Sequence, residues 1–295
     1  MTTTAEQDSN KIIEQLLDDR LGAIVKAANA DVLTYIGPIV GPVDDAIKFA
    51  VEEIDPRKKK ILMILETNGG YMETAERIAG ILRHHYTGVE FLVPSAAMSA
   101  GTILVMSGDA IHMDYASVLG PIDPQVRSAH GHASLVPALG YLEQYDRLID
   151  KAQNGTITTA ETTYLIQNFD PAALYQYEQE RDLAIALLTD WLVKYKFKSW
   201  KTTATRGEKV TKAMRTQRAE EIGRLLNKTD RWHSHNRGIT MEVLRRDLKL
   251  LIDDFGADPL LGPAVREYFR LLQDYTSRRG HFMMALHTRG TYEGY

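Results

Sequence analysis

Residues 89–109 read VEFLVPSAAMSAGTILVMSGD and contain the turn around which the rest of the chain is organised. The run Val89–Val93 has the β-branched and aromatic content of a buried strand, and Gly101–Met106 is typical of a short buried helix. Ser99 is therefore expected at a strand-to-helix turn. It is either a nucleophile presented beside free helix amides or an ordinary N-cap residue.

A similar strand-turn-helix unit precedes this one. Residues Ile61–Leu65 are all apolar, as expected for a strand that is buried on both faces of a parallel sheet, and residues 72–85 have helical spacing. Gly69 and Gly70 form the turn between them. Because ligands bind at the carboxyl ends of parallel strands, this turn and Ser99 are expected at the same edge of the sheet. The turn either presents a backbone amide to a bound carbonyl group or is a plain tight turn.

The remaining sequence predicts helices with a few short strands. An amphipathic helix over residues 8–29 comes first, and further helices are expected over 135–152, 159–168, 172–196, 219–226 and 263–275. The last residues are expected to form an unstructured polar tail. We predict an α/β fold of repeated βα units, divided into an N-terminal helical extension (1–30), a main domain (31–255) and a C-terminal helix and tail (256–295).

Composition excludes several classes of function. No apolar run approaches the roughly 20 residues of a membrane-spanning helix, and the first residues lack the pattern of a signal peptide, so we expect a cytoplasmic protein without a membrane span. The absence of cysteine excludes disulfides, thiolate metal sites and a cysteine nucleophile. A net charge of −4 does not favour nucleic-acid binding. The basic segment 194–218 is interpreted as a solvated face, with a patch for an acidic partner as the alternative.

Three motifs taken together resemble those of the Clp-type serine peptidases of the crotonase-like superfamily. They are LETNGG at 65–70, MSAG at 98–101 and VLGPIDPQ at 118–125. Within that superfamily the chain most resembles the serine dehydrogenase proteinase family, a relative of signal peptide peptidase A. The resemblance implies a ClpP/crotonase-like fold, a homo-oligomer and a peptide or protein substrate. Neither a metal nor any other cofactor is implied.

The same resemblance implies roles for individual residues. Ser99 would be the nucleophile, the amides of Gly70 and Ala100 would form the oxyanion hole, and Gly69 and Gly120 would contact the substrate. A serine hydroxyl is almost entirely protonated at neutral pH, so this set also needs a general base.

The sequence departs from the Clp pattern at the position of that base. Where the Clp peptidases have a histidine, this chain has Leu119, Gly120 and Pro121. Lys151 follows Ser99 at a spacing like that of the lysine base in signal peptide peptidase A, which predicts a Ser-Lys dyad. A lysine acts as a base only where burial or nearby cations lower its pKa from about 10.4.

Other residues remain as alternatives. His130 and His132 are the next candidates for the base, because imidazole titrates near neutral pH. His233 and His235 are candidate metal ligands, but two histidines without a nearby carboxylate pattern make a weak set. The family resemblance implies a serine endopeptidase.

Two other functions fit the same fold. The first is an inactive Clp-like scaffold or peptide-binding protein. The second is an acyl-CoA hydratase or isomerase, for which Glu66 and Glu73 would be the carboxylates to test.

Overall fold

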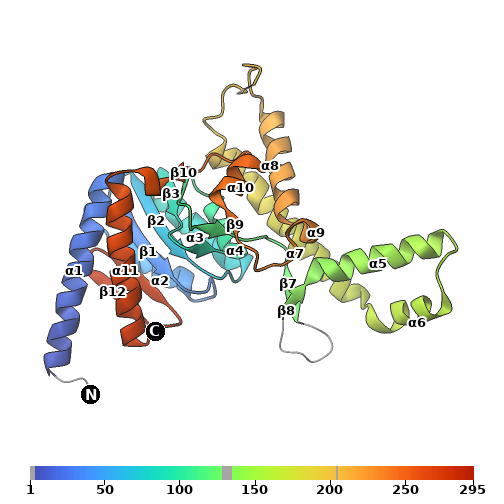
Figure 1. Cartoon of the computed structure of the whole chain (residues 1–295), viewed down its shortest axis with the longest axis horizontal. Coiled ribbons are helices and arrows are strands. Elements are labelled where there is room, and N and C mark those ends of the chain that lie inside the picture. Colours follow the sequence, from blue (N-terminus) through green and yellow to red (C-terminus); the bar gives the residue numbers. More distant parts are fainter. Residues whose placement is uncertain (1–3, 128–134, 204) are drawn as a thin grey trace.

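A seven-stranded sheet forms the centre of the molecule (Figure 1). The structure is a computed structural model that describes residues 4–127, 135–203 and 205–295. The strand order is β10-β5-β3-β2-β1-β11-β12, in which β1, β2, β3, β5 and β10 are parallel, whereas β11 and β12 are antiparallel. The strands span β1 Asp31–Ile36, β2 Lys60–Glu66, β3 Gly88–Leu92, β5 Ala110–Met113, β10 Asp253–Asp254, β11 Ala285–Thr288 and β12 Thr291–Gly294.

Helices cover both faces of this sheet. Helices α1 (Thr4–Ala28) and α11 (Leu261–Arg279) pack on one face, and α2 (Val43–Glu52), α3 (Met72–His85) and α4 (Ala100–Val105) pack on the other (Figure 1). Alternate residues of β2 enter the two cores, because successive side chains of a strand point to opposite faces. This is why Ile61–Leu65 is continuously apolar, and it confirms the predicted α/β class.

The C-terminal residues form a hairpin that completes the sheet, so the expectation of an unstructured tail is wrong. Strand β11 pairs with β1 in antiparallel register, and β12 pairs with β11. Ala285 and Leu286 are each only 2% exposed. The tail folds because β1 offers backbone groups that need partners and because Leu286 fills the core beneath them.

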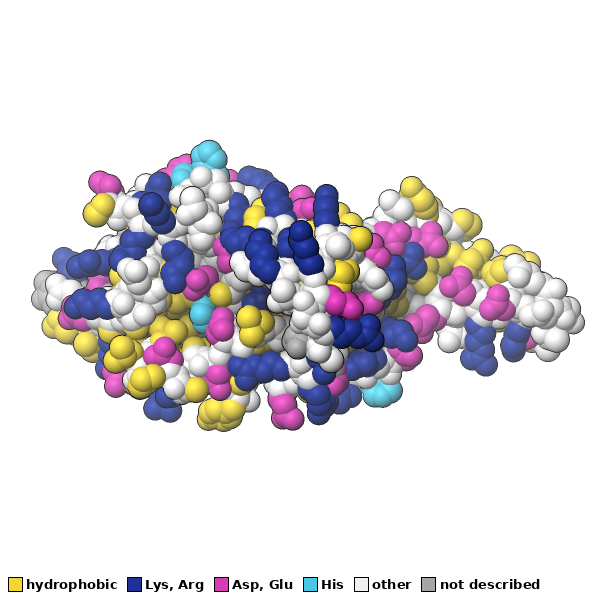
Figure 2. Space-filling view, turned by 90° about the horizontal axis from the view of Figure 1, so that it is seen from above, with side chains coloured by type: hydrophobic (Ala, Val, Ile, Leu, Met, Phe, Trp, Pro, Cys, Tyr) yellow, Lys and Arg dark blue, Asp and Glu magenta, His cyan; other side chains and the backbone are white. Residues whose placement is uncertain are grey.

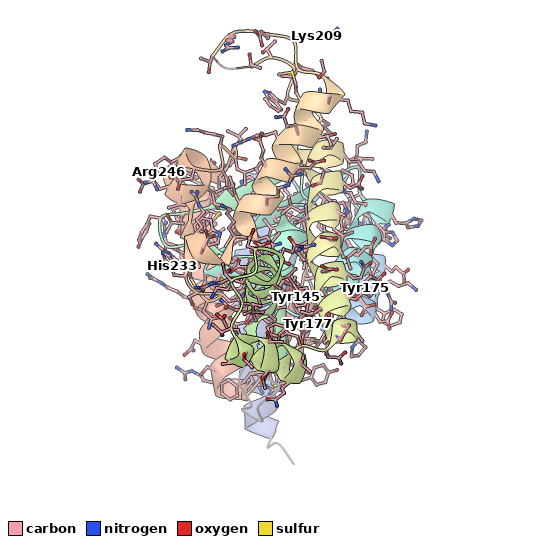
Figure 3. All side chains as sticks on the ribbon, turned by 90° about the vertical axis from the view of Figure 1, so that its right-hand side faces the viewer. Tyr145, Tyr175, Tyr177, Lys209, His233 and Arg246 are labelled. Carbon is pink, nitrogen blue, oxygen red and sulfur yellow. The ribbon has the colours of Figure 1, made fainter. Side chains whose placement is uncertain are left out.

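A helical arm projects from the body on the right of Figure 1. It contains α5 (Ala138–Gln153), α6 (Thr159–Asn168) and the first part of α7 (Pro171–Trp191), and a short hairpin of β7 (Gln125–Arg127) and β8 (Leu135–Pro137) joins it to the body. A separate small core holds α5 against α7, with Tyr145 and Tyr177 packed around it (Figure 3).

The basic segment is used partly within the fold. It runs from the π-helical turn η1 (Leu192–Lys196), which follows α7, through a protruding loop, with Lys209 near its tip, into α8 (Lys212–Leu226) (Figure 3). Lys198 pairs with Asp109, and Arg218 pairs with Glu221. At least these two basic side chains are thus used within the fold, while the solvated face and the acidic partner both stay predictions.

We expect Leu286→Ala to lower the free energy of unfolding by about 2–4 kcal/mol, because it removes a buried side chain and leaves a cavity. Chemical denaturation measures this change. The matched control is Met283→Ala, since Met283 lies just before the same strand but is 67% exposed. Its effect should stay within about 0.5 kcal/mol. Equal effects of the two changes would contradict the packing described for the hairpin.

The same strand predicts a pH dependence. Burial lowers the pKa of His287 to about 4, although the nearby Asp18 carboxylate opposes the shift. An unfolded histidine titrates near 6.5, so between these values the unfolded chain binds more protons and acidification destabilises the fold. From pH 7 to pH 5 the wild type should lose about 2 kcal/mol more unfolding free energy than His287→Gln. His84→Gln, at an exposed position of α3, should retain the wild-type loss. If His287→Gln lost as much unfolding free energy between pH 7 and pH 5 as the wild type does, the prediction would be wrong.

Candidate active site

A small three-stranded sheet positions the candidate site. Its strands are β4 (Ala96–Ala97), β6 (Val118–Leu119) and β9 (Ile239–Thr240), and β6 lies in the middle. β4 and β6 are parallel, whereas β6 and β9 are antiparallel, so Ala97, Leu119 and Ile239 lie side by side. The chain leaving β4, the chain leaving β6 and the chain entering β9 therefore meet at the same end of this sheet.

Ser99 lies between β4 and α4, as the sequence predicts, in an uncommon backbone conformation. Its φ is 53° and its ψ is −119°, a region that residues other than glycine rarely adopt. The side chain forms no capping hydrogen bond to the helix, which argues against a role as an ordinary N-cap. A serine held in this way on a sharp strand-to-helix turn has the geometry of a nucleophile elbow.

The Gly-Gly turn lies directly against Ser99. A Cβ added to Gly69 would be 2.8 Å from the Ser99 Cβ, and one added to Gly70 would be 2.1 Å from the carbonyl oxygen of Ile39. Both glycines also have positive φ angles, of 104° and 153°. The turn between β2 and α3 therefore requires glycine at both positions. The structure brings the turn and Ser99 together at the sheet edge where the sequence places them.

The backbone amides of Gly70 and Ala100, beside Ser99, are available to a ligand. The neighbouring amides are already paired, since the Gly69 amide donates to the Thr67 hydroxyl and the Tyr71 amide donates to the Ile39 carbonyl. By contrast, no acceptor among the described residues takes a hydrogen bond from the Gly70 or Ala100 amide. Unpaired donors of this kind can hold the negative oxygen of a tetrahedral intermediate.

These groups line a hollow of about 1110 Å³. Ser99, Gly70 and Ala100 lie on its wall, together with the apolar side chains of Val40, Met72, Ile103 and Ile122. A smaller hollow of about 580 Å³ lies along α7 and α8, and none of the motif residues lines it. The larger hollow is therefore the candidate site.

Gly120, another predicted substrate contact, is buried beside this hollow and does not line it. Its amide donates to the Thr102 hydroxyl at 2.9 Å, and that hydroxyl donates to the carbonyl of Ala97 at 2.8 Å. These bonds join β6 to β4 just before Ser99. A substrate contact at Gly120 stays a prediction.

Lys151 lies on α5, in the arm, and does not line the hollow. Its ammonium group pairs with Glu161, whose pKa falls to about 2 chiefly because of this hydrogen bond. A carboxylate partner favours the charged form of an amine, whereas a base needs the neutral form. The Ser-Lys dyad stays a prediction, and the alternatives His130 and His132 lie outside the described residues.

The structure reveals a histidine-carboxylate pair that the sequence analysis missed. His235 Nδ1 lies 2.9 Å from Asp123 Oδ1, and the two side chains are 14% and 2% exposed. His235 also lines the hollow that Ser99 lines. In the sequence the two residues are 112 positions apart, and the pairing of β6 with β9 that unites them has no clear sequence signal. No cluster suited to a metal ion occurs among the described residues.

The chain is similar to several known proteins. Residues 23–168 match the family described as ClpP-like SDH-type serine proteinase. One uncharacterized protein of Methanocaldococcus jannaschii is 38% identical over 106 residues, which cover 36% of this chain and 35% of that protein. A second from the same organism is 33% identical over 104 residues, covering 35% and 33%. The chain thus spans about a third of the length of these curated relatives.

A solved structure is also similar, that of a mutant of the 1510-N membrane-bound stomatin-specific protease. It has a TM-score of 0.44 and 14% identity, over 75% of this chain and 77% of that one. None of the helices within the described residues combines the length and the apolar character needed to cross a bilayer.

Through residues 23–168 the chain belongs to the ClpP-like SDH-type serine proteinase family. This confirms the resemblance inferred from the three motifs and supports a serine peptidase at the level of the family.

We expect Gly70→Ala to lower the free energy of unfolding by about 1–3 kcal/mol, because a side chain would be strained at its φ and would meet the Ile39 carbonyl. The matched control is Gly80→Ala in the exposed face of α3, where a Cβ would meet nothing within 4 Å. That change should raise the stability by about 0.5–1 kcal/mol. Thermal or chemical unfolding measures both, and a stabilising Gly70→Ala would contradict the described turn.

Proposed function

We propose that this protein is a serine peptidase that cleaves peptide bonds through an acyl-enzyme at Ser99. The observation that carries this proposal is the setting of the serine. Its hydroxyl lies on a positive-φ turn at the wall of the hollow, beside the amides of Gly70 and Ala100, which have no acceptor in the part of the chain that the structure describes. The family match supplies the reaction class.

In the proposed reaction the Ser99 oxygen attacks the carbonyl carbon of the substrate, and a base takes the hydroxyl proton. The carbonyl oxygen becomes an oxyanion that accepts hydrogen bonds from the Gly70 and Ala100 amides. Each donor contributes about 3 kcal/mol to lowering the barrier. The C–N bond then breaks, the amine leaves with a proton, and water hydrolyses the ester to regenerate the serine.

The proposed substrate is a peptide or an unfolded protein segment with an apolar side chain near the cleaved bond. The apolar residues of the hollow would bury that side chain, and Gly69 would allow the substrate backbone to approach.

We also propose a homo-oligomer in which the arm makes subunit contacts. Hydrophobic side chains are visible along the arm in Figure 2, and Tyr164, Ile166 and Tyr175 are more than half exposed. Exposed apolar groups gathered on one projection are typical of an interface.

One observation supports the acyl-CoA alternative: Glu73 lines the hollow. Glu66 does not line it. The Glu66 carboxylate accepts a hydrogen bond from Gln273, and its burial raises its pKa. A scaffold without catalysis remains the other alternative.

We expect the purified protein to react with a fluorophosphonate probe and to carry the adduct on Ser99. In-gel fluorescence measures the labelling, and mass spectrometry of the tryptic peptides locates it. Ser99→Ala should lose labelling at least 100-fold, because it removes the attacking oxygen.

The matched control is Ser95→Ala, four residues earlier before the same turn, which should label as the wild type does. An unlabelled but folded wild type would contradict the proposed acyl-enzyme. In that case, hydration of an enoyl-CoA that depends on Glu73 would support the acyl-CoA alternative, and its absence would favour the scaffold.

A further inference from the structure

We infer that His235 is the general base for Ser99 and that Asp123 is the residue that positions it. This inference rests on the proposed acyl-enzyme and names the base that the proposal needs. It assigns the base to a part of the chain that follows residues 23–168, the part matched by the family.

The register of the small sheet brings the three residues to one end of it. Ala97, Leu119 and Ile239 lie side by side, and Ser99 follows the first of them by two residues. Asp123 lies four residues after Leu119, and His235 lies four residues before Ile239. Because β6 and β9 are antiparallel, four residues forward from Leu119 and four residues back from Ile239 both lead beyond the same end of the sheet. There the side chains of Asp123 and His235 meet. The backbone alone thus directs the three residues to one end of the sheet.

The pair of Asp123 and His235 is arranged so that the ring can act as a base. Asp123 Oδ1 lies 2.9 Å from His235 Nδ1, and Asp123 Oδ2 accepts a hydrogen bond from the side-chain Nε2 of Gln125 at 2.9 Å. A buried carboxylate needs such hydrogen-bond partners. An ionised Asp123 carboxylate can only accept a hydrogen bond, so Nδ1 is the nitrogen of the His235 ring that carries the proton. Nε2 is then the basic nitrogen, and it has no acceptor or donor among the described residues. This is the tautomer that a serine base requires.

Several other basic side chains in the described part of the chain do not line the hollow. His112 pairs with Glu90 and His287 pairs with Asp18, but neither lines the hollow. Lys151 has a carboxylate partner and lies in the arm. Within the described residues, only His235 combines a carboxylate partner with a place on the wall that Ser99 shares.

In the inferred reaction one proton passes from Ser99 to His235 and then to the leaving group. As the bond from Ser99 Oγ to the substrate carbon forms, the hydroxyl proton moves to His235 Nε2, and the Asp123 carboxylate stabilises the resulting imidazolium. The same proton then moves to the leaving nitrogen when the C–N bond breaks. Asp123 stays ionised throughout, and it acts only through the ring.

The test compares rates of fluorophosphonate labelling of the full-length chain. His235→Asn should slow labelling at least 100-fold, since general-base catalysis by a positioned histidine contributes about 10²–10⁴-fold. The matched control is His233→Asn on the same turn (Figure 3), because His233 has no carboxylate partner among the described residues and asparagine tolerates its φ of 60°. It should label within about threefold of the wild type.

A second readout separates catalysis from structure. In His235→Ala, added imidazole should restore labelling in proportion to its concentration, because a free base can occupy the space left by the ring. Asp123→Asn should slow labelling while leaving the histidine in place, so added imidazole should not restore it. Lack of rescue in a folded His235→Ala, as judged by circular dichroism, would overturn the assignment.

The outcomes distinguish the two proposals. An unlabelled wild type overturns the acyl-enzyme and the inference with it. A labelled wild type together with an equally fast His235→Asn overturns the inference alone. If Lys151→Ala then loses labelling, the Ser-Lys dyad replaces it.

Discussion

The site depends on the pairing of β6 with both β4 and β9. Each of these strands is only two residues long, so the ladder of backbone hydrogen bonds is short. The Thr102 hydroxyl strengthens it by joining Ala97 to Gly120. The backbone at Gly238 also lies so close to Val118 that an added Cβ would be only 2.8 Å from it. This small sheet fixes the end of β4 and therefore the position of Ser99. It also brings the distant turn with His235 to the same place.

Close backbone contacts around Ser99 are the second constraint. Gly69, Gly70 and Gly101 each lie where a Cβ would meet a neighbouring atom at 2.8 Å or less. In this packing the Gly70 amide has no acceptor among the described residues, and Ser99 has a φ of 53°. Strained conformations persist only where the surrounding structure imposes them, and they concentrate at functional sites. The strain and the unpaired amides are thus consequences of the same packing.

The part of the chain that matches the family and the part that follows it contribute differently. Residues 23–168 carry Ser99, Asp123 and the amides of Gly70 and Ala100, so the family match covers the proposed nucleophile and the proposed oxyanion hole. His235 comes from the later part, whose strand β9 pairs with β6 beside the site. A relative that shares the first part alone would therefore lack the inferred base.

The sequence by itself determined the two βα units, the place of Ser99 at a strand-to-helix turn and its meeting with the Gly-Gly turn. These features follow from local apolar patterns and from the rule that parallel strands end at one edge. The sequence did not determine the folded C-terminal hairpin or the pair of Asp123 with His235. Both depend on pairing between residues far apart in the chain, β1 with β11 and β6 with β9. Strands this short carry little periodic signal, so only the tertiary structure decided which segments lie side by side.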